Sequence, residues 1–162
     1  MYEGRILVIN GPNLNMLGIR DPEKYGNITL EAINTELQKI AQKHKYHAVF
    51  FQSNCEGEIV SRIQRAYTDG DGTSGILINA AAYTHTSIAI LDALTLKGEG
   101  KAFPYVEVHL SDPKLREHFR RHSYLEASAI LTVSGHEDGS YYNGLTYLIL
   151  YLKGLKSKQP KT

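Results

Sequence analysis

The sequence predicts an α/β fold in which a central five-stranded parallel sheet is covered by helices on both faces. Short apolar runs rich in β-branched or aromatic residues, the pattern of buried strands, recur along the chain. Between these runs lie stretches whose apolar residues return at helical spacing. Such alternation favours right-handed βαβ units, which place all strands parallel and cover both faces of the sheet.

Each expected strand is a nearly continuous apolar run, as a parallel strand buried on both faces requires. They cover residues 6–9, 48–51, 75–78, 104–108 and 129–133. The glycine-rich and charged stretches 68–74 and 97–101 are expected to be surface turns.

The expected helices lie between and after these strands. Asn27 or Thr29 is a candidate N-cap for the first one, and Glu31 suits its first turn. A last helix is expected over residues 144–153. The apolar positions that define the helices are Leu30, Ile33, Leu37 and Ile40, then Ile59, Ile63 and Ala66, then Ile88, Leu91 and Leu94, and finally Leu145, Leu148, Ile149 and Leu152.

Length and charge limit the class of protein. A chain of 162 residues suits one domain, which we expect over residues 1–154 with a polar tail at 155–162. The 18 basic and 17 acidic residues give a net charge of +1, which argues against a surface built for nucleic acid or for an anionic membrane. Any binding site for an anionic small molecule must therefore be local.

Cysteine content and hydropathy indicate the compartment. Cys55 is the single cysteine, so the chain cannot form an internal disulfide. We find no apolar run of about 18 residues and no leader in which charged residues precede an apolar stretch. The expectation is a soluble protein of the cytoplasm.

Polar residues follow each expected strand at the point where it ends. In an open parallel sheet the carboxyl ends of the strands share one edge, and ligands bind in the crevice there. Each residue taken alone could instead cap a helix or form a turn. The polar groups are Asn10 and Asn13, Gln52 to Asn54, Asn79, His109 and Ser111, and Ser134 and His136.

Several chemistries lack their sequence signatures. The chain has no glycine-rich loop ending in Gly-Lys-Ser/Thr and no G-x-G-x-x-G after its first strand. Its histidines lie in different elements without the spacing of metal ligands, and His118 and His122 are interpreted as one solvated helix face. Cys55 could be a nucleophile, although a lone cysteine beside a strand end is more often inert. Acid–base chemistry without a metal or organic cofactor remains.

Two short motifs suit that chemistry. In "VEVHLS", Glu107 and His109 are two residues apart in a strand and face the same side, so the carboxylate can hold and charge the imidazole. In "LREHFRRHS", Arg116 and Arg120 would share one helical face and could receive a carboxylate. The alternatives are a self-satisfied pair at the edge of the core and an ordinary exposed basic face.

Four stretches carry a resemblance to the type II dehydroquinase family. They are "NGPNLNMLGIRDPEKYG", "FQSNCEGEIV", "INAAAYTHTSIAILDAL" and "VEVHLSDPKLREHFRRHSY", and they span nearly the whole chain in this order. The resemblance implies a flavodoxin-like three-layer fold, a homo-oligomer built as a dodecamer of trimers, and dehydration of 3-dehydroquinate to 3-dehydroshikimate. It implies no cofactor.

The resemblance also implies roles for residues. Tyr25 would be the base, Arg20 the cation that activates it, and His109 the general acid with Glu107 behind it. Asn13 would help to hold the water or the enolate oxygen. The residues implied in substrate binding are Asn79, His85, Leu110 through its backbone, Ser111, Arg120 and, from a neighbouring subunit, Asp92.

The chain also departs from the family pattern. Ala81 stands where a glycine is usual, which would restrict the backbone if the site needs a positive φ. Leu91 replaces an arginine, Cys55 replaces a histidine, and "SGHEDGSYYNGL" is longer than the usual link into the last helix. A non-catalytic ligand-binding or assembly homologue of the same fold is therefore the alternative function.

Overall fold

The computed structural model describes residues 1–19, 27–96 and 102–157. Its centre is a five-stranded sheet in the order β2-β1-β3-β4-β5, in which every neighbouring pair is parallel. The strands are β1 (Gly4–Asn10), β2 (Tyr46–Gln52), β3 (Thr73–Asn79), β4 (Tyr105–His109) and β5 (Leu131–Ser134). The predicted α/β class and all five predicted strands are thus confirmed.

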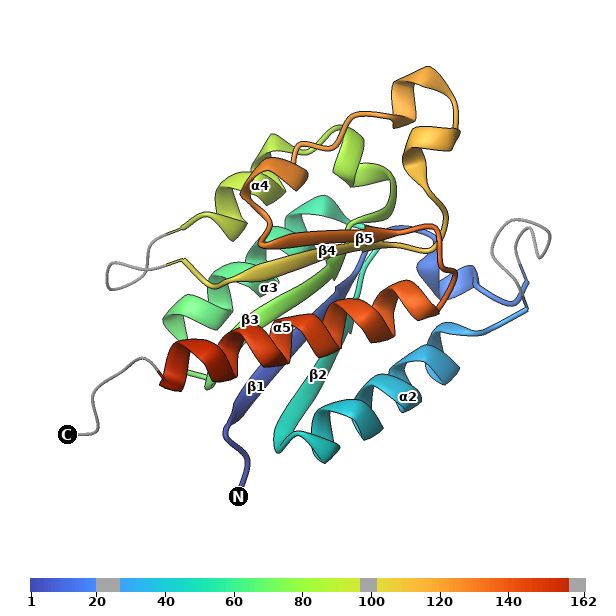
Figure 1. The fold of residues 1–162 in the computed structure, drawn as a ribbon. Helices are drawn as coiled ribbons and strands as arrows, with labels where there is room; N and C mark the ends of the chain where they lie inside the picture. The colour runs from blue at the N-terminus through green and yellow to red at the C-terminus, as the bar shows by residue number, and fades with distance from the viewer. Residues whose placement is uncertain (20–26, 97–101, 158–162) are drawn as a thin grey trace.

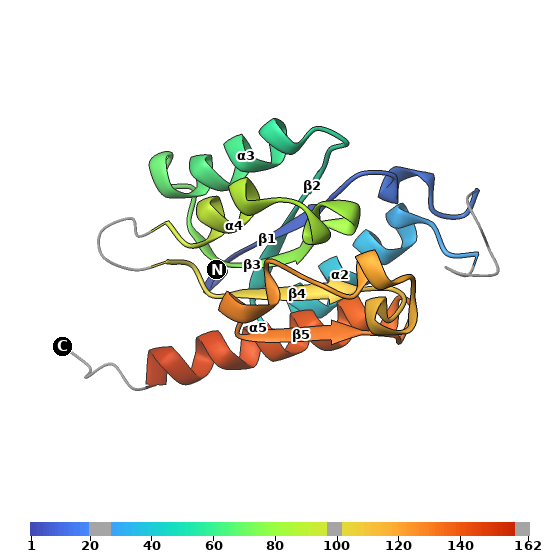
Figure 2. The ribbon, with the colours of Figure 1, turned by 90° about the horizontal axis from the view of Figure 1, so that it is seen from above.

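Helices lie on both faces of this sheet, which makes three layers (Figures 1 and 2). One face carries α2 (Leu30–Lys43) and α5 (Gly139–Ser157), and the other carries α3 (Glu56–Thr68) and α4 (Ile88–Leu94). Thr29 is the N-cap of α2, because its hydroxyl accepts a hydrogen bond from the Ala32 N–H at 3.1 Å. None of the described helices is long and apolar enough to cross a membrane.

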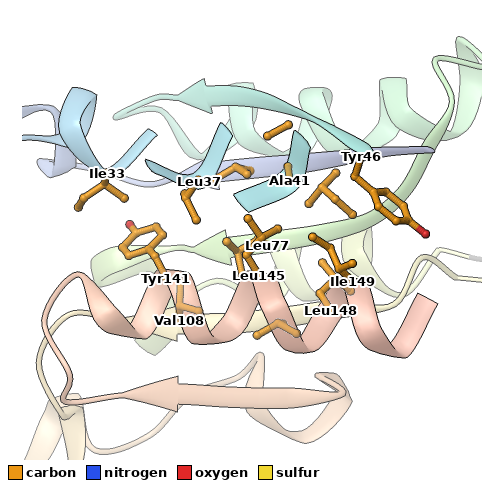
Figure 3. Close-up of a cluster of buried hydrophobic side chains, with 14 of the residues drawn as sticks. Ile33, Leu37, Ala41, Tyr46, Leu77, Val108, Tyr141, Leu145, Leu148 and Ile149 are labelled. Carbon is orange, nitrogen blue, oxygen red and sulfur yellow. The ribbon is translucent and has the colours of Figure 1, made fainter. Parts of the chain in front are cut away.

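Alternate residues of each strand supply two separate cores. In β1, Ile6 and Val8 face α2 and α5, whereas Leu7 and Ile9 face α3 and α4. Figure 3 shows the first core, where side chains of α2 and α5 gather with Leu77 of β3 and Val108 of β4. The near-continuous apolar strands of the sequence are explained by this burial on both faces.

Close packing of α5 on the sheet depends on Gly144. A Cβ added at this position would lie 2.6 Å from Cγ1 of Val108 and 3.1 Å from Cδ1 of Leu77. Val108 is β-branched and buried, so it cannot easily move away. The absent side chain therefore lets the first turns of α5 approach the carboxyl ends of the strands.

Some predicted boundaries were wrong. Residues 68–74 were expected to form a surface turn, but Thr68 still belongs to α3 and β3 already begins at Thr73. The last helix begins at Gly139, five residues before the expected start, and continues to Ser157. The other expected turn, at residues 97–101, lies outside the described residues.

Candidate active site

A cavity of about 180 Å³ opens at the carboxyl end of the sheet, the end to which the arrows point in Figure 1. It gathers residues that follow β1, β3 and β4, as the crevice rule for parallel sheets predicts. The lining residues are Pro12, Asn13, Leu14, Leu17, Asn79, Ala81, Ala82, His85, His109, Leu110, Ser111, Pro113, Arg116 and Arg120.

The predicted pair of Glu107 and His109 is present at this cavity. Both lie on β4, and Nε2 of His109 is 2.9 Å from Oε1 of Glu107. Glu107 is completely buried behind His109, whose side chain reaches the cavity with 9% of its surface exposed. Because an ionised carboxylate only accepts hydrogen bonds, Nε2 donates, and Nδ1 is the ring nitrogen left for chemistry with a ligand.

Hydroxyl groups from three separate parts of the chain hold the Glu107 carboxylate. Thr84 donates to Oε1, Ser123 donates to the same oxygen at 2.8 Å, and Thr132 donates to Oε2 at 3.3 Å. Burial alone would raise the pKa of Glu107, but hydrogen bonds from His109, Thr84 and Ser123 and the charge of His109 outweigh it, so the pKa is lowered. The carboxylate therefore stays ionised and can stabilise a charged imidazole.

His85 presents an acceptor to the cavity. Its Nδ1 is 2.7 Å from the backbone oxygen of His122. A carbonyl oxygen only accepts, so Nδ1 carries the proton. Burial, together with the charges of His109 and Arg120, lowers the pKa of His85 against the opposing effects of the His122 hydrogen bond and Glu107. The neutral ring then has an unprotonated Nε2, which can accept a hydrogen bond from a ligand hydroxyl.

Asn79 and Ala81 form the floor between β3 and the next short helix. The Asn79 side chain accepts a hydrogen bond from the Ala81 N–H through Oδ1 at 3.0 Å. Ala81 adopts φ 51°, in the left-handed region that favours glycine. A glycine would adopt this positive φ without strain, and the contact with Asn79 holds the alanine there.

The two arginines reach the cavity by a different route from the one predicted. They do not share a helical face, because Pro113–Leu115 and His118–Arg120 are separate 3-10 turns and Arg116 between them is extended. His122 lies beyond the second turn, so the predicted helical face of His118 and His122 is also wrong. Oε2 of Glu117 is 3.5 Å from Nε of Arg116 and 3.2 Å from Nε of Arg120, which gathers the two guanidinium groups.

Asn13 is positioned by the loop after β2. Its φ is 66°, a left-handed conformation that asparagine tolerates, and its N–H donates to Oδ1 of Asn54 at 2.9 Å. Gln52 at the end of β2 donates to the Gly11 carbonyl at 3.2 Å and supports the same loop without lining the cavity. Leu110 and Ser111, which follow β4, form another part of the wall.

Three predicted site residues are not seen at the cavity. Asp92 is exposed on α4 and does not line it. Arg20 and Tyr25 lie outside the described residues. The chain on either side of them meets beside the cavity, since Leu17 lines it and a Cβ added at Gly18 would lie 3.7 Å from the Asn27 carbonyl oxygen.

Sequence reasoning missed the residues that support the site from behind. Thr84, Ser123 and Thr132 bond Glu107 from distant parts of the chain, and no periodic pattern marks them. Tyr141 on α5 contacts Asn79 and was assigned only to the link before the last helix. The available sequence signal for Tyr141 was its hydroxyl group on a helix face that is otherwise apolar.

The described residues offer no gathering of three or more His, Cys, Asp or Glu side chains that could hold a metal ion. Cys55 is exposed, is the N-cap residue of α3, and does not line the cavity. The polar groups at the cavity are instead amides, imidazoles, a hydroxyl and guanidinium groups. Such a set can bind hydroxyl and carboxylate groups and can transfer protons.

Comparison with known proteins gives consistent relatives. A protein of Prochlorococcus marinus subsp. pastoris named 3-dehydroquinate dehydratase is 49% identical over 147 residues, 91% of this chain and 96% of that protein. A protein of Clavispora lusitaniae named catabolic 3-dehydroquinase is 46% identical over 148 residues, 91% of this chain and 98% of that protein. The type II dehydroquinase structure from Butyrivibrio crossotus has a TM-score of 0.82 and 39% identity, and the match covers 90% of this chain and 97% of that one.

The sequence model of the family described as dehydroquinase class II matches residues 4–149. This range includes the whole sheet and every residue that lines the cavity. The chain belongs to the class II, or type II, dehydroquinase family.

Proposed function

We propose that this protein is a 3-dehydroquinate dehydratase, a lyase that removes water from 3-dehydroquinate to give 3-dehydroshikimate through an enolate. Membership of the class II dehydroquinase family and relatives named for this activity support the reaction. The observation that carries it is the buried Glu107 carboxylate behind His109 at the cavity. This arrangement can deliver a proton to a departing hydroxyl group.

His109 is the proposed general acid. The ionised Glu107 stabilises the doubly protonated imidazole and accepts a hydrogen bond from its Nε2–H, so Nδ1 can donate a proton toward the cavity. As the bond between C1 of the substrate and its hydroxyl oxygen breaks, that proton joins the oxygen and water leaves. The electron pair of the enolate then forms the double bond between C1 and C2, conjugated with the ketone.

The cavity wall also suits the rest of the substrate. The proposed partner of its carboxylate is Arg120, with Arg116 beside it, because guanidinium groups bind carboxylates through planar arrays of donors. Nε2 of His85 can accept from a hydroxyl group, and Asn79 and Ser111 offer further hydrogen bonds. The Leu110 backbone is the proposed additional contact.

The first proton would be taken by Tyr25. An unperturbed tyrosine has a pKa of about 10 and needs a nearby cation to act as a base at neutral pH. Arg20 is the proposed cation, and Asn13 is proposed to hold the water that stabilises the enolate oxygen. These roles rest on the motif resemblance and on the position of Leu17 and Gly18 beside the cavity.

The test is to mix the purified protein with 3-dehydroquinate and to follow the ultraviolet absorbance of the conjugated enone. We expect steady turnover in the wild type and a loss of about 10²- to 10⁴-fold in Tyr25→Phe, which keeps the ring but removes the base. Binding of the substrate without any enone would instead identify the non-catalytic homologue that Ala81 suggested.

A second experiment separates this scheme from covalent catalysis. Attack on the ketone by a lysine would form an imine, which borohydride reduces to a stable adduct. Turnover should survive borohydride added together with substrate. Irreversible loss of activity with a substrate-sized mass increase on a lysine would contradict the tyrosine scheme.

We propose further that the protein works as a homo-oligomer, a dodecamer of trimers in the cytoplasm, in which Asp92 reaches the cavity of a neighbouring subunit. Asp92 is exposed on α4, one turn from Ile88, an isoleucine with 54% of its surface exposed. Oligomers mixed from Asp92→Ala and Tyr25→Phe subunits should recover turnover through hybrid sites. No recovery despite proof of mixing by mass spectrometry would remove Asp92 from the site.

The proposed location in the cytoplasm agrees with the single cysteine, because the exposed thiol of Cys55 suits a reducing compartment.

A further inference from the structure

A buried chain of hydrogen bonds connects the cavity to helix α5. Nδ2 of Asn79 lies 2.9 Å from the hydroxyl oxygen of Tyr141, and that oxygen lies 2.7 Å from Oδ1 of Asn10. Asn10 and Tyr141 are completely buried, and Asn79 is buried where it lines the cavity. Three elements distant in sequence, β1, β3 and α5, therefore meet through polar groups.

The direction of each hydrogen bond is fixed by chemistry. The Ala81 N–H can only donate, so the Asn79 atom beside it is the oxygen and the atom beside Tyr141 is the nitrogen. Burial, partly offset by the Asn79 hydrogen bond, raises the pKa of Tyr141, so its hydroxyl keeps its proton. That proton is donated to Asn10, and the Tyr141 oxygen is left to accept from Asn79.

The packing of α5 brings the Tyr141 hydroxyl close to the carboxyl ends of the strands. Gly144 lets α5 pack tightly on β4, and Tyr141 lies one turn earlier on the same face as Leu145 and Leu148 (Figure 3). Asn10 contributes only its oxygen, because its Nδ2 is buried without a hydrogen-bond partner among the described residues. A buried unpaired donor costs stability, which a purely structural site would avoid with an apolar side chain.

We propose that Tyr141 is a positioning residue that holds the Asn79 amide with its nitrogen available to the substrate. One N–H of Asn79 is used by Tyr141, and the second is left as a donor at the cavity wall. With Asn79 as donor and Nε2 of His85 as acceptor, the wall selects ligands that carry hydroxyl groups. This inference rests on the proposed dehydratase function.

KM and kcat together distinguish a positioning role of Tyr141 from a role in stability alone. A hydrogen bond from Asn79 to a substrate hydroxyl is made both before and during the reaction, so weakening it should raise KM and leave kcat nearly unchanged. A loss of folded protein would instead lower the apparent kcat and leave KM unchanged. The two quantities therefore report on different causes.

The experiment compares Tyr141→Phe with Tyr67→Phe. Tyr67 is a matched control, because its hydroxyl also accepts one hydrogen bond, from the Phe103 N–H at 3.2 Å, and donates one, to the Leu94 carbonyl at 3.4 Å, away from the cavity. With 3-dehydroquinate, Tyr141→Phe should raise KM by about 5- to 50-fold and change kcat by less than about threefold. Tyr67→Phe should keep the wild-type KM.

A double-mutant cycle shows whether the effect passes through Asn79. In an Asn79→Ala background, adding Tyr141→Phe should change KM by less than about twofold. An unchanged KM in Tyr141→Phe, or an equal rise with and without Asn79, would overturn the inference while wild-type turnover leaves the proposed function standing. Absence of wild-type turnover would overturn both.

If Tyr141→Phe does not fold, Asn10→Ala supplies the same test. It removes the acceptor that orients the Tyr141 hydroxyl, and we expect KM to rise at least about threefold. A KM equal to that of the wild type in Asn10→Ala would then contradict the proposed role of the hydrogen-bond chain.

Discussion

The two ends of the sheet each hold a carboxylate whose pKa is lowered, but the partners differ. At the start of β3, Asp71 accepts hydrogen bonds from the Thr73 N–H and hydroxyl at 2.9 and 2.6 Å and lies 3.3 Å from an Nη atom of Arg62. In β4, two residues before the end of the strand, Glu107 is held by hydroxyl groups and by His109. Burial opposes the lowered pKa in both, and hydrogen bonds and neighbouring positive charge overcome it.

The difference lies in what the partner can do. Arg62 is always charged, so the cluster around Asp71 can only hold the loop in place. His109 has an imidazole ring that can pass a proton to a ligand, and it reaches the cavity. A lowered pKa does not by itself mark a catalytic carboxylate. The informative feature is a partner that can transfer a proton and that lines the cavity.

The backbone repeats this contrast along a single strand. Before β3, the positive φ angles of 57° and 79° fall on Gly70 and Gly72. After β3, the positive φ of 51° falls on Ala81, which lines the cavity. The loop with a structural role has relaxed glycines, whereas the loop at the cavity holds a strained residue.

The largest expected difference between the two carboxylates is in turnover. Glu107→Gln removes the negative charge behind His109, so turnover of 3-dehydroquinate should fall about 10²-fold. Asp71→Asn is the matched control and should keep kcat within about twofold, since Asp71 is remote from the cavity. Steady-state kinetics of the two folded variants measures both values. An equal loss of turnover in both would mean that the two carboxylates do not differ in their role.

At the other end of the sheet, replacement of Asp71 should lower the stability of the protein, although it should leave turnover nearly unchanged. Asp71→Asn weakens the ion pair with Arg62 and leaves donors of Thr73 less well paired, so the free energy of unfolding should fall by about 1–3 kcal/mol. Denaturant titration at pH 7 measures this change. A variant as stable as the wild type would mean that the Asp71 cluster does not hold the loop.

The same carboxylate predicts a pH dependence. Because the folded pKa of Asp71 lies below its ordinary value of 3.8, its stabilisation is complete above that value and is lost as the pH falls through the lower folded pKa. The stability difference between wild type and Asp71→Asn should therefore shrink in acid. Unfolding curves at pH 7 and at about pH 3 compare the two; a difference that grew in acid would have the wrong sign.

The smallest expected effects come from the two loops of β3. Gly72→Ala meets no atom within 4 Å but forces a left-handed alanine, so it should destabilise by about 1 kcal/mol. Ala81→Gly releases such strain at the cost of greater chain entropy, so it should stabilise by about 0.5–1 kcal/mol. Thermal unfolding measures both changes in stability. Changes of opposite sign would support the contrast between the two loops, and changes of the same sign would contradict it.

Much of the fold follows from local patterns. The strands were predictable because both faces of the sheet are covered and each strand is a continuous apolar run. The first turns of α5 were missed because Gly139 and Ser140 have the composition of a loop. The helix begins there nonetheless, since Tyr141 and Leu145 bury one face against the sheet.

The site was predictable only where its contacts are short in sequence. Glu107 and His109 are two residues apart in a strand, so their contact follows from strand geometry. The hydrogen bond between Asn79 and Tyr141 spans 62 residues, and the one between Asn10 and Tyr141 spans 131. The path of Arg116 and Arg120 was mispredicted because Pro113 starts a short turn that ends before a helix can form.

Neutron diffraction from a deuterium-exchanged crystal at neutral pH would test most directly whether Glu107 acts as an ionised partner of His109. We predict a deuteron on Nε2 of His109, directed at Oε1 of Glu107, and none on either carboxylate oxygen. Deuterons should also point to this carboxylate from Thr84 and Ser123. A deuteron on Glu107, or an Nε2 without a deuteron facing it, would show that Glu107 is not an ionised acceptor of His109.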